Sequence, residues 1–327
     1  MIFDTEFPTC REGVFVPVPF ATAEQIVDIV VEAERLGYNA VWGTDFVTPT
    51  ACYNVPDAAE PNWYEPLITL AYCAARTTRI KLGTGVLLVP YREPVMLAKQ
   101  VATLDQLSQG RFLLGLGLGM CRDELDAILP RLGKAHRGNM LDEHLELLHL
   151  LLARDSGKVT YQGKYLEVRG VEMDPKPVQD PLPIYVPGKS AESLERVAKW
   201  GLGYMIRSVT MAERVAALAP YLEKHGRELS EIDVVAESEL YMAPTHEAAV
   251  EAYFASRHGQ FRVTKEAQDS IVEKNWIGTA NEIIDKIGKA KDEGARHFCV
   301  LHVAGDTVEV MLDQLRMFAE EVIPAVS

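Results

Sequence analysis

The sequence lacks the hydrophobic segments that membrane insertion or secretion would require. It contains no run of about 18 consecutive apolar residues, so no membrane-spanning helix is predicted. The first residues, Met1-Ile-Phe-Asp-Thr-Glu, have no basic segment ahead of an apolar run, and no signal peptide is predicted. We therefore expect a cytoplasmic protein that does not bind membranes.

Positive charge and cysteine are also scarce. The chain has 33 Lys and Arg against 47 Asp and Glu, a net charge of −14, which argues against the basic surface that nucleic acids and anionic membranes require. The eight histidines form no ligand pattern of the metal-binding type, so no metal is predicted. The cysteines show no C-x-x-C spacing and are expected to be reduced thiols: Cys10, Cys52, Cys73, Cys121 and Cys299.

Strand-like and helix-like segments alternate along all 327 residues. A representative helix, Ala23 to Leu36, has an N-cap at Thr22 and a stop at Gly37. Several strands are continuous apolar runs, as expected where both faces of a sheet are buried. The predicted strands are Val14–Val18, Ala40–Asp45, Ile80–Val89, Phe112–Leu116, Leu182–Pro187, Leu202–Ile206, Asp233–Tyr241 and His297–Val303.

This pattern predicts an α/β fold, a (β/α)8 TIM barrel that forms a single domain over residues 1–327. Two segments interrupt the alternation and are interpreted as insertions, a hairpin at about 156–181 and a polar segment at about 258–276. A doubly wound sheet is the alternative. It is disfavoured because the glycines of Gly115-x-Gly-x-Gly119 lack the G-x-G-x-x-G spacing.

Glycine gathers near the ends of two successive strands. Gly110-Arg-Phe-Leu-Leu-Gly-Leu-Gly-Leu-Gly119 changes from an apolar strand into alternating glycines, and Leu82-Gly-Thr-Gly-Val86 does the same one helix earlier. Glycine lets a flat or phosphorylated ligand approach bare backbone. The two segments together predict a cofactor-binding face.

These motifs resemble the luciferase-like monooxygenase superfamily, whose members are barrels that use a flavin or a deazaflavin. The similarity extends over nearly the whole chain. It rests on the two glycine segments and, in order along the sequence, on Val41-Trp-Gly-Thr-Asp45, Arg92-Glu-Pro94, Arg137-Gly with Leu141-Asp-Glu143, Pro175-Lys-Pro-Val-Gln179 and Pro183-Ile-Tyr-Val-Pro-Gly-Lys-Ser190.

The resemblance implies a set of cofactor-binding residues. The peptide between Gly85 and Val86 matches a non-proline cis bond on which the cofactor ring leans, and Pro187-Gly-Lys-Ser190 matches the loop that binds the cofactor phosphate. Ser190 could instead be a plain N-cap, and Asp45 could cap the loop that follows it. The full set is Asp45, Thr84, Gly85, Val86, Gly117, Asp123, Pro187, Gly188, Lys189 and Ser190.

The sequence departs from the family at two positions. Phe46 stands where many relatives carry a histidine, and Met120 stands where the deazaflavin-dependent sugar-phosphate dehydrogenases carry a glutamate. Without this acid–base pair, sugar-phosphate dehydrogenation is not expected. The predicted substrate pocket is apolar and consists of Phe46, Trp63, Tyr91 and Met120.

The catalytic residues are left open by the sequence. Residues of these kinds are more often structural, but proton donors that could lie near the same face are Tyr53, Tyr91, Arg122 and Glu124, with Glu239 and His302 as further options. The favoured function is hydride transfer between coenzyme F420 and a small apolar substrate. The alternatives are an FMN-dependent monooxygenase supplied by a partner reductase, and a barrel that binds flavin without catalysis. A homodimer is expected from the resemblance.

Overall fold

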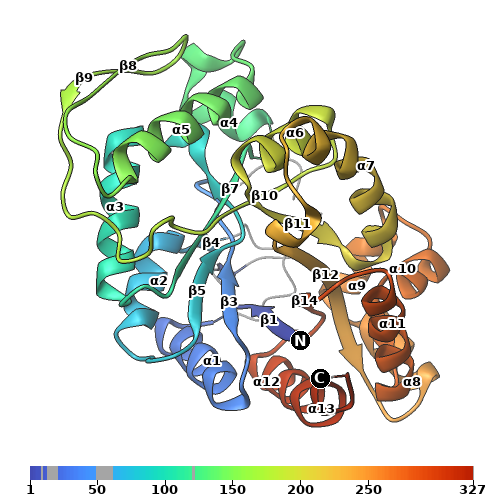
Figure 1. Ribbon diagram of the computed structural model, residues 1–327. Helices are drawn as coiled ribbons and strands as arrows, with labels where there is room; N and C mark the ends of the chain where they lie inside the picture. The colour runs from blue at the N-terminus through green and yellow to red at the C-terminus, as the bar shows by residue number, and fades with distance from the viewer. Residues whose placement is uncertain (9, 13–20, 49–61, 120–121, 327) are drawn as a thin grey trace.

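The computed structural model describes residues 1–8, 10–12, 21–48, 62–119 and 122–326. Eight parallel strands of the described chain close into a barrel, with helices around its outside (Figure 1). The closure is made where β10 pairs with β7. The barrel strands are β1 (Ile2–Glu6), β3 (Ala40–Gly43), β5 (Lys81–Thr84), β7 (Phe112–Gly117), β10 (Ile184–Pro187), β11 (Gly203–Arg207), β12 (Val234–Met242) and β14 (His297–Val303).

The TIM barrel is thereby confirmed, with one correction at its first strand. The sequence analysis assigned that strand to Val14–Val18, which lies outside the described residues. The barrel instead begins with Ile2–Glu6, which pairs with β14 and β3. The polar residues Asp4, Thr5 and Glu6 concealed this strand, because a buried strand is normally recognised by a continuous apolar run.

Helices follow most strands and pack on the outer face of the barrel (Figure 1). The helix expected at Ala23–Leu36 is confirmed, with a capping box at Thr22 and a left-handed C-cap at Gly37. The helices are α1 (Ala23–Leu36), α2 (Pro66–Ala74), α3 (Pro94–Leu107), α4 (Arg122–Ile128), α5 (Arg137–Leu152), α6 (Ala191–Trp200), α7 (Met211–Lys224), α8 (His246–Ala255), α9 (Arg257–Val263), α10 (Gln268–Lys274), α11 (Ala280–Asp292), α12 (Val308–Met317) and α13 (Ile323–Val326).

The two interruptions of the alternation take different forms. In the first, β8 (Val159–Gln162) and β9 (Glu167–Val171) form an antiparallel hairpin. The second contains the short helices α9 and α10. The remaining short strands are β2 (Cys10–Glu12), β4 (Asn62–Trp63), β6 (Leu87–Leu88) and β13 (Trp276–Gly278).

The floor of the barrel, at the N-terminal ends of the strands, is closed by a polar network in which Asp4 and His297 are buried and Asp233 is 41% exposed. His297 donates a hydrogen bond from Nε2 to Asp4 (2.6 Å) and another from Nδ1 to Asp233 (3.0 Å). Tyr185 donates its hydroxyl proton to Asp233 (2.7 Å). Burial acts to lower the pKa of His297, but the two carboxylates outweigh it and raise the pKa to about 10.

Trp42 connects this floor to the wall above it. Its indole Nε1 donates to Asp4 (2.8 Å), and its ring packs edge-on against Tyr185. A Cβ at Gly83 would lie only 2.3 Å from the ring, and one at Gly85 would lie 3.2 Å from the Trp42 Cβ. The glycines of β5 therefore make room for this indole inside the barrel.

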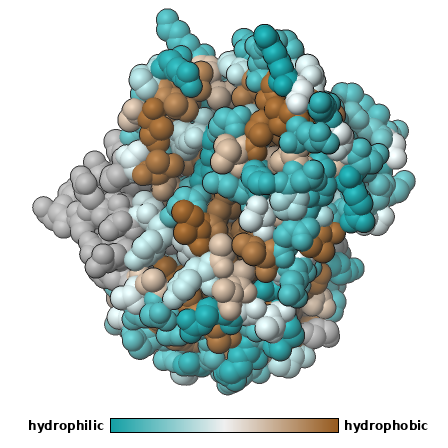
Figure 2. Space-filling view, turned by 90° about the vertical axis from the view of Figure 1, so that its left-hand side faces the viewer, coloured by the Kyte–Doolittle hydropathy of each residue, from teal (hydrophilic) through white to brown (hydrophobic). Residues whose placement is uncertain are grey.

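The side of the molecule that carries α2, α3 and the β8–β9 hairpin is largely hydrophilic, with separate apolar spots (Figure 2). Large apolar side chains exposed on these two helices include Ile68, Met96 and Leu107. No helix in the described part of the chain combines the length and apolarity that crossing a membrane requires.

Candidate active site

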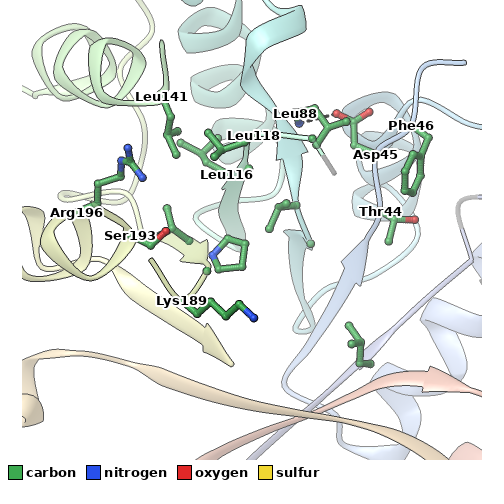
Figure 3. Close-up of a pocket in the computed structure, with 18 of the residues that line it drawn as sticks. Thr44, Asp45, Phe46, Leu88, Leu116, Leu118, Leu141, Lys189, Ser193 and Arg196 are labelled. Carbon is green, nitrogen blue, oxygen red and sulfur yellow. Dashed lines mark hydrogen bonds between the residues drawn. The ribbon is translucent and has the colours of Figure 1, made fainter. Parts of the chain in front are cut away.

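A cavity of about 670 Å³ opens at the C-terminal ends of the barrel strands. Active sites of TIM barrels lie at this end. Figure 3 shows Lys189, Ser193 and Arg196 on one side of the cavity, with Thr44, Asp45 and Phe46 across from them. The lining consists of Glu6, Thr44, Asp45, Phe46, Gly85, Val86, Leu88, Leu116, Gly117, Leu118, Gly119, Leu141, Val186, Pro187, Gly188, Lys189, Ser193, Arg196, Leu301 and His302.

One wall of the cavity is formed by the ends of β5 and β7. The peptide between Gly85 and Val86 is cis, as the resemblance implied. A Cβ at Gly117 would lie 2.3 Å from Cγ2 of Val86, so only glycine lets these two strand ends approach so closely. Thr84 is fully buried beneath the wall, where its hydroxyl donates to the carbonyl of Gly115 (2.8 Å). The result is a thin, apolar surface against which a flat ring can lie.

A second corner of the cavity offers donors for an anion. Pro187, Gly188 and Lys189 are exposed at the end of β10, and the structure gives the Lys189 ammonium no partner among the described residues. Gly188 has φ of +122°, and a Cβ there would lie 2.4 Å from Oγ of Ser193. Ser190 caps α6 by accepting from the backbone N–H of Ser193 (3.3 Å). The corner thus combines a helix N-terminus with a free ammonium group.

A smaller cavity of about 330 Å³ adjoins this corner and shares Leu118 and Arg196 with the first. Its lining includes Arg122, His136, Arg137 and Arg196 together with one acid, Glu192. Arg196 is buried, and its guanidinium is held by Asp142 (2.5 Å) and by the carbonyl of Gly138 (3.0 Å). Arg122, which the sequence offered as a proton donor, lies in this second cavity and bonds Asp126 (3.3 Å). The anion corner therefore continues into a basic groove.

Asp45 lines the cavity but its carboxylate is already engaged. Oδ2 accepts hydrogen bonds from Arg92 (2.5 Å) and from the backbone N–H of Leu88 (2.8 Å). Arg92 also contacts Glu65 (3.0 Å). Burial raises the pKa of Asp45, against the opposing effect of Arg92. From this position Asp45 connects the end of β3 to Arg92 and to β6.

The other candidates from the sequence are placed differently relative to the cavity. Glu124 is buried and accepts from the backbone N–H of Val47 (2.8 Å) and from the hydroxyl of Tyr91 (3.0 Å), so it secures the segment that follows β3. Asp123 is exposed on α4 and lines neither cavity. Phe46 does line the cavity and packs against Trp63 with ring centroids 4.5 Å apart. Tyr53 and Met120 lie outside the described residues.

Two ionisable residues of the lining come from the neighbouring strands β1 and β14. Nδ1 of His302 hydrogen-bonds Oε2 of Glu6, and both side chains face the cavity. Burial raises the pKa of Glu6. Burial acts to lower the pKa of His302, but the carboxylate of Glu6 outweighs it and the pKa is raised. The sequence analysis missed Glu6 together with its strand, and it had placed His302 only among the further options.

A backbone irregularity brings His302 into the barrel. In a regular strand, His297 and His302 would face opposite sides because they are five residues apart. Between β12 and β14, however, Ser238 pairs with Val300 and Glu239 with His302, so Leu301 is an extra residue. Such bulges redirect side chains near active sites. No signal in the sequence marks this bulge.

The chain was compared with protein families and with known proteins. The model of the family described as "Luciferase-like monooxygenase" matches residues 9–320. An F420-dependent glucose-6-phosphate dehydrogenase of Microbacterium testaceum is 28% identical over 324 residues, which cover 92% of either chain.

Two solved structures share the fold. An F420-dependent secondary alcohol dehydrogenase, in complex with an F420-acetone adduct, superposes with a TM-score of 0.79 at 20% identity, covering 100% of this chain and 99% of the other. The oxygenating constituent of 3,6-diketocamphane monooxygenase from Pseudomonas putida, in complex with FMN, has a TM-score of 0.78 at 18% identity, also covering 100% and 99%.

Proposed function

Since the chain belongs to the luciferase-like monooxygenase family, we propose that it binds coenzyme F420 in the cavity and uses it for hydride transfer with a small, largely apolar substrate. The relatives make it an F420- or FMN-dependent oxidoreductase. When bound, such a cofactor supplies the hydride chemistry, and the protein supplies binding, orientation and proton transfer.

The observation that carries this proposal is the pairing of the thin wall with the anion corner. The glycine-lined end of β7 and the Gly85–Val86 peptide leave space for a tricyclic ring. Across the cavity, Lys189 and the N-terminus of α6 would hold a phosphate. In this arrangement the net negative charge of the protein is no obstacle, because the anion is bound by local donors.

Two observations favour F420 over FMN. The F420-dependent glucose-6-phosphate dehydrogenases of Microbacterium testaceum and Kineococcus radiotolerans match more than nine tenths of this chain. The side chain of F420 also continues beyond its phosphate into a series of carboxylates, whereas FMN ends at the phosphate. The basic groove of Arg122, His136 and Arg137 would accommodate such an extension.

The proposed substrate differs from that of these relatives. Phe46 faces the cavity beside Trp63, at the position where many family members carry a histidine. Leucine and valine side chains contribute much of the remaining lining, among them Leu88, Leu116, Leu118 and Val186. A sugar phosphate would bury hydroxyl groups against these side chains without hydrogen-bond partners, at considerable cost. An apolar substrate with one polar group suits this lining better.

The direct test is a binding titration of the purified protein with F420 and, separately, with FMN, monitored by quenching of each cofactor's fluorescence. We expect saturable binding of F420 at least about tenfold tighter than that of FMN, which corresponds to about 1.4 kcal/mol. Tight binding of FMN alone would overturn the proposal. The titration is repeated with F420 whose carboxylate tail is shortened or absent. Binding should then be weaker if the basic groove holds the tail.

An FMN-dependent monooxygenase is the second candidate, and the apolar lining favours it specifically. A site that excludes water protects a reactive reduced flavin from wasteful side reactions. A partner reductase would then supply the reduced cofactor. Consumption of dioxygen by the protein with chemically reduced FMN and an apolar ketone would distinguish this candidate from the first.

The homodimer is proposed on the exposed apolar side chains of α2 and α3. Ile68, Met96 and Leu107 are each more than half exposed, and a second copy of the chain could cover them. Light scattering during gel filtration would give the mass directly. A mass of 36.3 kDa, that of one chain, would contradict the dimer.

A further inference from the structure

Most ionisable groups that line the main cavity are engaged elsewhere or belong to its anion corner. Asp45 is bound to Arg92 and to the backbone of Leu88. Arg196 is bound to Asp142, and Lys189 extends from the anion corner (Figure 3). The remaining pair, Glu6 and His302, comes from β1 and β14 on another side of the barrel mouth. The proposed cofactor chemistry leaves this pair unexplained.

Two polar atoms of this pair have no hydrogen-bond partner among the described residues. His302 uses Nδ1 to bond Glu6, and no hydrogen bond from the described residues reaches its Nε2. The second carboxylate oxygen of Glu6, Oε1, is buried and also has no hydrogen-bond partner. Oε1 of Glu6 is enclosed by the protein, whereas Nε2 of His302 is not among the buried atoms and lies on a side chain that lines the cavity, so a ligand that enters the cavity can bond this nitrogen.

Behind the pair, the carboxylate of Glu239 is fully engaged, while Nδ1 of His258 and Nε of Arg262 are buried without a hydrogen-bond partner in the described part of the chain. Glu239 accepts from Tyr253 and His258, and lies 3.3 Å from Arg207 and 3.2 Å from Arg262. The ring of His258 packs edge-on against that of His302, with centroids 5.4 Å apart. This cluster fixes the orientation of the His302 imidazole, as residues behind an active-site histidine generally do.

We propose that His302 is a catalytic residue that exchanges a proton, through Nε2, with a carbonyl or hydroxyl oxygen of the substrate, and that Glu6 is the residue that positions it. The inference rests on the proposed function, because the substrate oxygen exchanges a proton only when a hydride is transferred to or from the adjacent carbon. It assigns the substrate class as ketones and secondary alcohols with apolar substituents. Leu301 beside His302 and Phe46 line the same cavity and would contact those substituents.

The proton and electron balance is complete without a further reactant. In the reducing direction, the carbonyl carbon gains the hydride that the bound reduced cofactor supplies, and the π pair of the C=O bond moves onto oxygen. That oxygen takes the proton from Nε2 of His302, which changes from imidazolium to imidazole and regains a proton from solvent. Oxidation of the alcohol follows the same path in reverse, with neutral His302 accepting the hydroxyl proton.

The pH dependence follows from the groups that face His302. Glu6 on β1 and Glu239 on β12 favour its protonated form, while Arg207 on β11 opposes it. His258 on α9 contacts its ring. Glu237 on β12, whose pKa burial raises to about 7, also interacts electrostatically with His302. Ketone reduction should therefore slow as pH rises through the raised pKa of His302, and alcohol oxidation should accelerate.

The first experiment does not depend on turnover. In protein labelled with ¹⁵N at histidine and loaded with reduced F420, which cannot accept a hydride from an alcohol, cyclohexanol is titrated while the imidazole resonances are recorded. We expect the Nε2 resonance of His302, assigned with His302→Gln, to shift on binding while that of His246 on the exposed face of α8 stays fixed. In Glu6→Gln, the pKa of His302 should fall. A His302 resonance that does not respond to cyclohexanol overturns the inference.

The second experiment measures reduction of cyclohexanone by reduced F420. His302→Gln should lower kcat by about 100-fold or more, and Glu6→Gln by about tenfold with its pH profile displaced to lower pH. The F420 dissociation constant should change less than about twofold in either variant. His246→Gln, the same substitution at an exposed histidine, is the control. Far-UV circular dichroism checks folding, and Glu6→Gln, nearly isosteric, keeps the test valid if His302→Gln misfolds.

The outcomes separate this inference from the proposed function. Failure of the wild-type protein to bind F420 removes the proposed function. Binding of F420 with no reduction of cyclohexanone or of a linear 2-alkanone overturns the substrate class assigned here. Reduction that proceeds equally fast in His302→Gln overturns the role of His302 while the proposed function stands.

Discussion

Strands β1 and β14 each place one ionisable side chain at the floor of the barrel and another at its mouth. At the floor, Asp4 meets His297, and all four of their polar side-chain atoms have hydrogen-bond partners. At the mouth, Glu6 meets His302, and one oxygen and one nitrogen are without hydrogen-bond partners among the described residues. The same chemistry thus stabilises the fold at one end and is available to a ligand at the other.

The difference follows from the architecture. The floor is closed by Trp42, Asn39 and Tyr185, which satisfy the two acids around His297. The mouth opens into the cavity, so Nε2 of His302 can be satisfied by what enters it, while Oε1 of Glu6 is buried and unpaired within the described residues. Proteins commonly give up stability at functional sites in this manner. Variants at the floor should therefore change mainly the stability of the fold, and variants at the mouth mainly the binding of the ligand.

The largest expected effect is at the floor. Asp4→Asn removes the charge that balances His297, and breaking one partner of a buried ion pair should lower the free energy of unfolding by about 3 kcal/mol. Urea denaturation measures this loss. The matched variant at the mouth, Glu6→Gln, should cost less than about 1 kcal/mol, since it loses a carboxylate that is only partly bonded. Equal losses of unfolding free energy in the two variants would contradict the difference proposed between floor and mouth.

The next effect concerns ligand binding at the mouth. Combined Lys189→Ala and Ser190→Ala removes the ammonium and the hydroxyl of the anion corner, and should weaken F420 binding by about 100-fold, or about 2.7 kcal/mol. Stability in urea should hardly change. Lys199→Ala, in the last turn of the same helix, is the control. An unchanged dissociation constant in the double variant would contradict the proposal that this corner binds the phosphate.

A smaller effect is expected at the thin wall. Gly117→Ala places a Cβ 2.3 Å from Cγ2 of Val86, so the wall must shift toward the ligand, and F420 binding should weaken by about tenfold. Adding Val86→Ala should restore part of the loss, because it removes the clashing methyl. Gly157→Ala, where a Cβ meets nothing within 4 Å, controls for the loss of a glycine. A double variant that binds no better than Gly117→Ala would argue against this clash.

The smallest expected effect is a decrease in folding stability with rising pH, caused by His297 at the floor. The pKa of His297 is raised to about 10 in the folded protein, above its usual 6.5. A raised pKa gives stability that is complete below the unfolded value and is lost as pH rises through the folded value. The melting temperature should therefore fall by a few degrees between pH 7 and pH 10. Asp233→Asn should flatten this slope, and a slope unchanged in that variant would contradict the assignment.

The sequence predicted the features that local rules or a family motif carry. Thr22 and Gly37 bound α1 because capping is a local property. The cis peptide at Gly85–Val86 and the loop of Pro187 to Ser190 at the start of α6 followed from the resemblance. The same resemblance led the sequence analysis to name part of the lining, namely Asp45, Phe46, Gly85, Val86, Gly117, Pro187, Gly188 and Lys189.

What the sequence could not predict depends on contacts between distant segments. Glu6 belongs to a strand whose polar residues Asp4 and Thr5 look exposed until the barrel pairs them with β14. His302 faces the cavity only because Leu301 is an extra residue in its pairing with β12. Neither long-range pairing nor a bulge has a signature in a single sequence, so the acid–base pair of the mouth became visible only in the structure.

The position of Trp42 has a spectroscopic consequence. Its indole donates to Asp4 at the floor and packs beneath Gly83 and Gly85, at the base of the wall on which the cofactor ring is proposed to lean. The emission of this one residue should therefore report both on the integrity of the floor and, by energy transfer, on an aromatic ring bound above it. Comparison with Trp42→Phe isolates its signal from that of the other three tryptophans. The barrel thus contains its own optical probe, located between the region that keeps it folded and the region that is proposed to do its chemistry.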